Sequence, residues 1–216
     1  MLVYAVADIH GNPHHLETIR NTVQREQPDV LVVAGDLSSH FGSGAREVMT
    51  ALGLLNVPVF AIHGNTDGKS TRELMAQTPG ITDLHLKLAH VNGVTFVGAG
   101  GTVPVPFRSR LALFEKGMVR QLERLMTPGC VLVVHPPPFG VTDRVLGRFN
   151  AGSRSVAALV KKQEPSLCIC GHIHENAGSA MLDGTLVANC AMGRASAGAL
   201  IHLENGLIPD CQMVVP

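Results

Sequence analysis

Five short apolar runs in this chain each end at a polar residue that can bind a metal ion. The runs are β-branched and bounded by glycine or proline, which is typical of buried β-strands. They are Leu2–Ala7 before Asp8 and His10, Val30–Ala34 before Asp36, Val57–Ile62 before Asn65, Val131–Val134 before His135, and Leu167–Cys170 before His172 and His174. Helical stretches separate most of the runs, so we expect parallel strands whose carboxyl ends bring these polar residues to one edge.

The segments between the runs predict an α/β fold. An apolar stripe made by Leu16, Ile19 and Val23 predicts a helix over His14–Gln27. Further helices are expected near Ala45–Leu55, Ser70–Gln77, Leu111–Met126 and Gly152–Gln163. Asn92-Gly93 predicts a hairpin between Asp83–Val91 and Val94–Gly98, and short strands follow His174. Two packed mixed β-sheets, a β-sandwich with helices on both outer faces, account for this mix, and residues 1–216 are expected to form a single domain.

The bulk composition narrows the classes of function. Net charge is zero and aromatic residues make up 4% of the 216 residues, which argues against binding to nucleic acid through a basic surface or a stacking platform. No apolar run reaches the roughly 20 residues that span a bilayer, and we recognise no signal peptide. The five cysteines include no Cys-x-x-Cys pair, so reduced, buried side chains are favoured over a thiolate site at Cys168 and Cys170. A cytoplasmic location is therefore expected.

The polar residues at the strand ends suit a pair of metal ions. Asp8 and His10 are two residues apart, so on an extended segment their side chains leave from the same face, and the same holds for His172 and His174. Carboxylate, imidazole and amide donors without thiolate suit manganese, iron, zinc, nickel or cobalt better than calcium or magnesium. Two such ions about 3.5–4 Å apart can generate a hydroxide at neutral pH and clamp an in-line displacement at phosphorus.

The strand-end motifs together resemble a known superfamily of metal-dependent enzymes. Asp8-x-His10, Gly35-Asp36, Gly64-Asn65-x-Asp67, His135 and Gly171-His172-x-His174 occur in the order and rough spacing of the calcineurin-like metallophosphoesterases. The segment from His135-Pro-Pro-Pro through Asp143 and Gly152-Ser153 to Cys-Gly-His-Ile-His-Glu is similar to small bacterial and archaeal phosphoesterases of that superfamily. The resemblance implies a four-layer fold, a β-sandwich with flanking helices, and two divalent transition-metal ions, with manganese as the first choice.

The resemblance also implies a set of ligands. Asp8, His10, Asp36 and His174 would hold the first ion, and Asp36, Asn65, His135 and His172 the second, so that Asp36 bridges. Asp36, Asn65 and His135 are also the candidate catalytic residues. Arg144 and Arg148, with Arg108 and Arg110 in another loop, could bind the non-bridging oxygens of a phosphate, although a solvated loop is an equally good interpretation.

One position departs from the family pattern. Many relatives have a histidine directly after Gly-Asn that protonates the leaving group or stabilises the transition state, whereas this chain has Thr66, whose hydroxyl cannot act as a general acid near neutral pH. We expect a dinuclear metal-dependent phosphoesterase in which a metal-bridging hydroxide attacks a small phosphoester, with a phosphodiesterase favoured over a phosphomonoesterase. The alternative is a weakly active or inactive protein of this fold that serves as an interaction scaffold. Self-association remains open.

Overall fold

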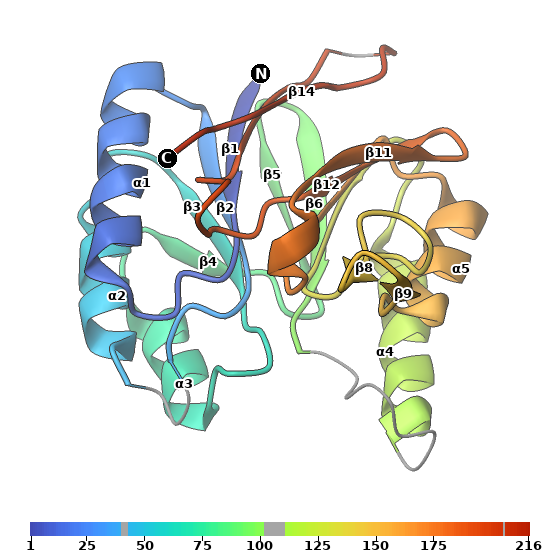
Figure 1. Ribbon diagram of the computed structural model, residues 1–216, viewed down its shortest axis with the longest axis horizontal. Coiled ribbons are helices and arrows are strands. Elements are labelled where there is room, and N and C mark those ends of the chain that lie inside the picture. The colour runs from blue at the N-terminus through green and yellow to red at the C-terminus, as the bar shows by residue number, and fades with distance from the viewer. Residues whose placement is uncertain (40–42, 102–110, 205) are drawn as a thin grey trace.

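Two six-stranded sheets lie face to face, and helices cover the outer side of each sheet (Figure 1). The computed structural model describes residues 1–39, 43–101, 111–204 and 206–216. Three helices cover the first sheet, α1 (Pro13–Glu26), α2 (Ala45–Gly53) and α3 (Lys69–Gln77), and two cover the second, α4 (Leu111–Leu125) and α5 (Arg154–Gln163) (Figure 1). The predicted four-layer α/β fold is confirmed.

Each sheet has a parallel centre with antiparallel strands at one or both sides. The first sheet has the order β14-β13-β1-β2-β3-β4, with bounds β14 (Asp210–Met213), β13 (Ala199–His202), β1 (Leu2–Val6), β2 (Val30–Ala34), β3 (Val59–Ile62) and β4 (Ile81–Asp83). The second has the order β11-β12-β10-β7-β6-β5, with bounds β11 (Gly178–Leu182), β12 (Thr185–Asn189), β10 (Leu167–Cys170), β7 (Val131–Val134), β6 (Val94–Ala99) and β5 (Lys87–Val91). A separate small hairpin pairs β8 (Arg144–Val145) with β9 (Phe149–Asn150), and the 3₁₀ turn η2 (His174–Asn176) follows β10.

The alternation of side chains along each strand builds three apolar layers. In β1, Val3 and Ala5 face the second sheet, whereas Tyr4 and Val6 face the helices on the other side. In β10, Leu167 and Ile169 likewise join the core between the sheets, and their neighbours join the core under α4 and α5. Because both faces of these strands are covered, the runs are apolar throughout rather than alternating, which is the pattern that the sequence shows.

The hairpin expected over Asp83–Val91 and Val94–Gly98 is only partly correct. Its second half, β5 and β6, pairs across Asn92-Gly93 as predicted. Asp83, however, ends β4, which pairs in parallel with β3 in the first sheet, so the chain crosses between the sheets around Leu84. Leu84 is fully buried in the core between the sheets, and this tertiary contact overrides a continuous strand.

The five predicted strand ends divide between the two sheets. β1, β2 and β3 belong to the first sheet, and β7 and β10 belong to the second. Backbone hydrogen bonds join the sheets at their carboxyl ends, because Ala7 N–H donates to Cys190 C=O at 3.0 Å and Met192 N–H donates to Ala7 C=O at 2.9 Å. The strand-end loops of both sheets therefore meet at one edge of the sandwich.

Candidate metal centre

The first group of donors contains Asp8, His10 and His174. Asp8 Oδ1 lies 3.2 Å from His174 Nε2 and 3.8 Å from His10 Nε2, and the rings of the two histidines are stacked. Asp8 is completely buried, and its Oδ1 accepts no hydrogen bond of good geometry within the described chain. The Asp8 carboxylate raises the pKa of His174 above its usual value. A buried carboxylate oxygen that faces two imidazoles is the arrangement expected of a cation site.

The second group contains Asp36, His135 and His172, with Asn65 beside it. His135 Nδ1 donates to the Ala34 carbonyl at 2.8 Å, which turns its Nε2 towards Asp36 Oδ2 at 3.4 Å and Asn65 Oδ1 at 3.1 Å. In the neutral ring Nε2 then carries a lone pair that faces two oxygen acceptors. A proton or a metal ion between them relieves this repulsion. Burial works to lower the pKa of His135, but the carboxylates of Asp36 and Asp8 outweigh burial and raise it.

Asp36 lies between the two groups. Its Oδ2 is 3.4 Å from His135 Nε2 and 3.9 Å from His10 Nε2, whereas its Oδ1 accepts a hydrogen bond from Thr66 N–H at 2.9 Å. Burial works to raise the pKa of Asp36, but the imidazole of His135 and the N–H of Thr66 outweigh it, so the pKa falls below its usual range. Asp36 is thus an ionised carboxylate placed to touch a cation in either group.

The geometry of both groups fits divalent ions. Within each group the ligand atoms lie within 4.8 Å of one another, a spread that bonds of about 2.0–2.2 Å to a central ion can close with small side-chain movements. The donors are nitrogen and oxygen only. Cys168 and Cys170 instead face the helix layer, where burial raises the pKa of Cys168 to about 12 and keeps its thiol protonated.

The backbone at these positions differs from the extended geometry that we expected. Asp8, His10, Asp36 and His172 all have positive φ, from 52° to 72°. Aspartate and histidine tolerate this left-handed region better than most residues, and Asp8 N–H and His10 N–H each donate to the β2–α2 loop, at Gly35 C=O and Asp36 C=O. His172 and His174 do not share a face as their spacing predicted: a positive φ at His172 and a 3₁₀ turn at His174 place them in different donor groups.

Two glycines allow these loops to approach one another closely. A Cβ on Gly64 would collide with the carboxylate of Asp36, and a Cβ on Gly171 would collide with Ala7 and Asp8. Gly171 thereby lets His172 N–H reach Asp8 Oδ2 at 2.8 Å. The Gly-Asn and Gly-His pairs of the sequence are therefore required by packing around the two aspartates.

Asp67 supports the second group and was not identified from the sequence as more than part of a motif. Its carboxylate accepts hydrogen bonds from Leu37 N–H, Ser38 N–H, Ser38 Oγ and Gly64 N–H, at 2.8–3.1 Å. It thus joins the loop that carries Asp36 to the loop that carries Asn65. The available signal was an aspartate three residues after a glycine, which is also typical of an ordinary turn.

Removal of this carboxylate is expected to destabilise the protein strongly. In Asp67→Ala three buried N–H groups and one hydroxyl lose their acceptor, and we expect the free energy of unfolding to fall by about 3 kcal/mol. Thermal unfolding by circular dichroism measures the change. Asp67→Asn keeps part of the acceptor set, so its Tm should lie between those of wild type and Asp67→Ala. A Tm for Asp67→Ala equal to that of wild type would refute the role of Asp67 in joining the two loops.

Asn189 at the end of β12 has a similar supporting role that the sequence did not indicate. Its Nδ2 lies within hydrogen-bond distance of the carbonyls of Thr142, Ile173 and Asn176, at 2.9–3.2 Å. Two of these carbonyls flank His174. The side chain therefore fixes the η2 turn against the second sheet.

Thr66 lies beside Asp36 and joins its own loop to the β2–α2 loop. It is buried, and its hydroxyl donates to the Ser38 carbonyl at 2.8 Å while its N–H binds Asp36. The position that carries a histidine in many relatives here ties two loops together. A threonine hydroxyl is no general acid near neutral pH, so Thr66 does not replace that histidine as the proton donor for a leaving group.

The predicted phosphate-binding residues Arg144 and Arg148 are exposed. Arg144 and Arg148 belong to the β8–β9 hairpin, and Arg144 N–H donates to Asn176 Oδ1 of η2 at 2.8 Å. Arg108 and Arg110 lie outside the described residues.

His14 is exposed in the first turn of α1, where the His14 N–H donates to the capping side chain of Asn12.

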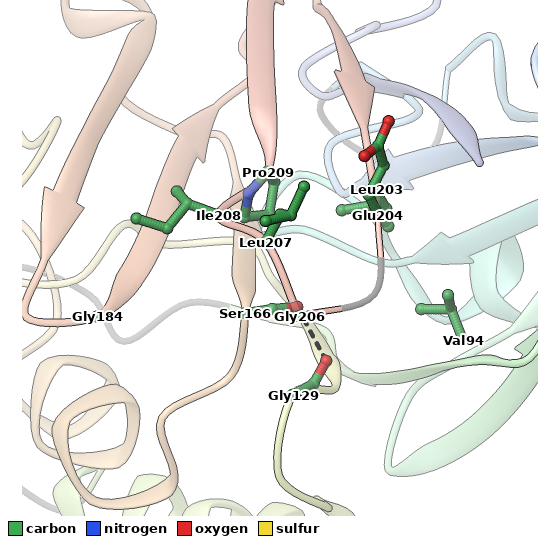
Figure 2. Close-up of a pocket in the computed structure, with 10 residues that line it drawn as sticks. All are labelled: Val94, Gly129, Ser166, Gly184, Leu203, Glu204, Gly206, Leu207, Ile208 and Pro209. Carbon is green, nitrogen blue, oxygen red and sulfur yellow. Dashed lines mark hydrogen bonds between the residues drawn. The ribbon is translucent and has the colours of Figure 1, made fainter.

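A separate pocket of about 310 Å³ lies at the opposite ends of the strands. Figure 2 shows its lining, which comes from the segments before β7 and β10 and from the β13–β14 connection, and includes Ser166, Leu207 and Ile208. None of the donor residues lines it.

In the described part of the chain no helix is long and apolar enough to cross a membrane.

The sequence model of the calcineurin-like phosphoesterase family matches residues 1–176. No curated protein sequence matches the chain.

Several solved structures share its fold. The structure of TT1561 of Thermus thermophilus has a TM-score of 0.71 at 16% identity, covering 93% of each chain. GAP50, described as the anchor in the inner membrane complex of Plasmodium, has a TM-score of 0.67 at 14% identity, over 100% of this chain and 84% of that one. A protein described as a novel archaeal phosphodiesterase has a TM-score of 0.53 at 14% identity, over 100% of both chains. By its family match and its fold, this chain belongs to the calcineurin-like phosphoesterase family.

Proposed function

We propose that residues 1–216 act as one dinuclear metal-dependent phosphodiesterase domain for small phosphoesters. The observation that carries the proposal is Asp36, whose Oδ2 lies within 4 Å of a ring nitrogen from each donor group. Manganese is the first choice of metal, with iron, zinc, nickel and cobalt as alternatives that suit the same donors. Bound ions of this kind activate a water molecule and neutralise charge on the phosphate.

The side chains themselves would orient the reaction. In this proposal Asp36, Asn65 and His135 are the catalytic residues. The hydrogen bond from His135 to Ala34 fixes the ring, and Asn65 is an exposed amide beside Nε2 of that ring, where it can meet both an ion and a phosphate oxygen. Asp8, His10 and His174 would complete the first ion site, and His172 the second. The five cysteines are free and four of them are buried, which fits a reducing compartment, so we place the protein in the cytoplasm.

The test is metal-dependent hydrolysis by reconstituted protein. The protein is stripped with a chelator, reloaded with manganese, iron, zinc, nickel, cobalt or magnesium, and assayed on bis-(p-nitrophenyl) phosphate and p-nitrophenyl phosphate. We expect no hydrolysis before reloading, and afterwards a rate on the diester more than about tenfold above the rate on the monoester. A faster monoester reaction would reject the diesterase assignment, and no reaction with any metal would reject the enzyme.

We further propose that Arg144 and Arg148 help to hold the phosphate. The double alanine variant should raise KM about threefold to tenfold, because an exposed contact between a guanidinium and a phosphate contributes about 1 kcal/mol. Metal content should not change. Lys161→Ala/Lys162→Ala is the matched control, since it removes two exposed cations from α5. An unchanged KM in the arginine variant would show that the two arginines do not hold the phosphate and that their loop is an ordinary solvated one.

The alternative function is an interaction scaffold that has lost catalysis. The observation that favours it is Thr66, whose hydroxyl is engaged with Ser38 rather than with the centre. A scaffold has no need for two complete donor groups around a bridging carboxylate, and the presence of both in this chain leads us to favour the enzyme. Tight binding of two ions without any hydrolysis would favour the scaffold.

A further inference from the structure

The β8–β9 hairpin is held against the η2 turn, which begins with the candidate ligand His174. Its loop starts after His135, and its backbone is tied to η2, where Arg144 N–H donates to Asn176 Oδ1 and Leu146 N–H donates to Glu175 Oε1 at 2.8 and 3.3 Å. η2 begins with His174. The hairpin is therefore positioned by the same segments that place a donor of each group.

The tip of this hairpin has an unusual residue for its conformation. The turn Val145–Arg148 is closed by a hydrogen bond from Arg148 N–H to Val145 C=O at 3.1 Å, and its central residues Leu146 and Gly147 have φ of 51° and 65°. Turns with positive φ at both central positions favour asparagine, aspartate or glycine. A leucine is disfavoured there, so its presence calls for a reason outside local stability.

The tip is also apolar and open to solvent. Leu146 is 75% exposed and Phe149 is 64% exposed, and the exposed side chains of Arg144 and Arg148 flank them. Folding gains little from either apolar side chain in this position. Exposed apolar side chains on the same short hairpin as exposed cations suit a ligand that has both an apolar and an anionic part.

We propose that Leu146 and Phe149 bind the organic group of the phosphoester, so that the substrate class is phosphoesters with an apolar or aromatic substituent. This inference rests on the proposed function, because it places the phosphate at the metal centre. Continuity argues for this occupant, since the hairpin and His174 belong to one hydrogen-bonded unit. The face of Phe149 offers a flat contact for a ring, and Leu146 offers an aliphatic one.

The test compares two non-hydrolysable ligands, so it does not depend on turnover. Affinities of manganese-loaded protein for phenylphosphonate and methylphosphonate are measured by isothermal titration calorimetry. Wild type should bind the phenyl compound about tenfold more tightly. Leu146→Asn and Phe149→Ser should each remove most of this preference and leave the affinity for methylphosphonate unchanged. Leu207→Asn is the matched control, because Leu207 is 62% exposed at the pocket in Figure 2 and should retain the full preference.

A stability measurement separates recognition from damage to the fold. Asparagine suits the positive φ at position 146, so Leu146→Asn should raise Tm by about 2 °C while selectivity is lost. Equal binding of both phosphonates by wild type, or equal loss of selectivity in Leu207→Asn, would overturn the proposal. A third set of results would also overturn the proposal: wild type co-sediments with phosphatidylglycerol vesicles, Leu146→Asn abolishes this co-sedimentation, and wild type shows no preference for phenylphosphonate.

The outcomes also distinguish this inference from the proposed function. Hydrolysis of diesters with no preference for the phenyl ligand would leave the enzyme assignment intact and reject the role of the tip. If the protein hydrolyses no ester but prefers the phenyl ligand in a way that depends on Leu146, the ligand-binding role of Leu146 would be supported and the phosphodiesterase function would be rejected.

Discussion

Replacement of Asp36 by alanine is expected to remove both metal ions from the protein. Asp36 Oδ2 lies near His135 of one donor group and near His10 of the other, so its loss opens both sites. After metal loading and desalting, elemental analysis should give about two ions per chain for wild type and close to none for Asp36→Ala, and activity should fall more than about 100-fold.

Two further variants make this result specific. Asp36→Asn retains an oxygen that can accept the hydrogen bond from Thr66 N–H, so the fold should persist while the lost charge weakens both sites. His174→Ala affects only the first group and should lose one ion. Asp210→Ala, at an exposed position of β14, should keep both ions. Loss of a single ion in Asp36→Ala would show that another group bridges.

The rate of hydrolysis is expected to depend steeply on the leaving group. Thr66 is buried and its hydroxyl is bound to Ser38, so the described residues place no proton donor at the position where many relatives have histidine. A positioned acid contributes about 10²–10⁴-fold, and esters with poor leaving groups should be slower than nitrophenyl esters by at least that range. Rates across a series of phenyl methyl phosphates with graded phenol acidity measure the dependence.

Thr66→Val separates the structural role of the hydroxyl from a chemical one. Valine keeps the shape but leaves the Ser38 carbonyl without this donor, so Tm should fall while the slope against phenol acidity stays the same. Thr66→Ser should keep both the Tm and the slope of wild type. A flat dependence in wild type would mean that another group already protonates the leaving oxygen.

The identity of the donor residues could be predicted from the sequence because the information is local. An apolar run that stops at aspartate, asparagine or histidine is visible along the chain, and parallel strands must end on one side of their sheet. Asp8, Asp36 and His135 were predicted as donors in this way, and the structure places Asp8 in one donor group and Asp36 and His135 in the other. The helices followed from their apolar stripes, and the β-sandwich from the mix of strands and helices together with the family resemblance.

The grouping of the donors could not be predicted from spacing. His172 and His174 are two residues apart, but the positive φ of His172 and the 3₁₀ turn at His174 send them to different groups. These backbone states are stabilised by hydrogen bonds to residues far along the chain, such as His172 N–H to Asp8 Oδ2. No window of sequence around His172 contains that partner.

The sequence by itself therefore indicated which residues are candidate metal ligands and where most of the strands lie, because both depend on residue type and local pattern. Only the tertiary structure decided which strands share a sheet, and that Asp67 and Asn189 hold their loops. The physical reason is that these features depend on non-local hydrogen bonds and close packing at glycine, which exist only once the two sheets have met.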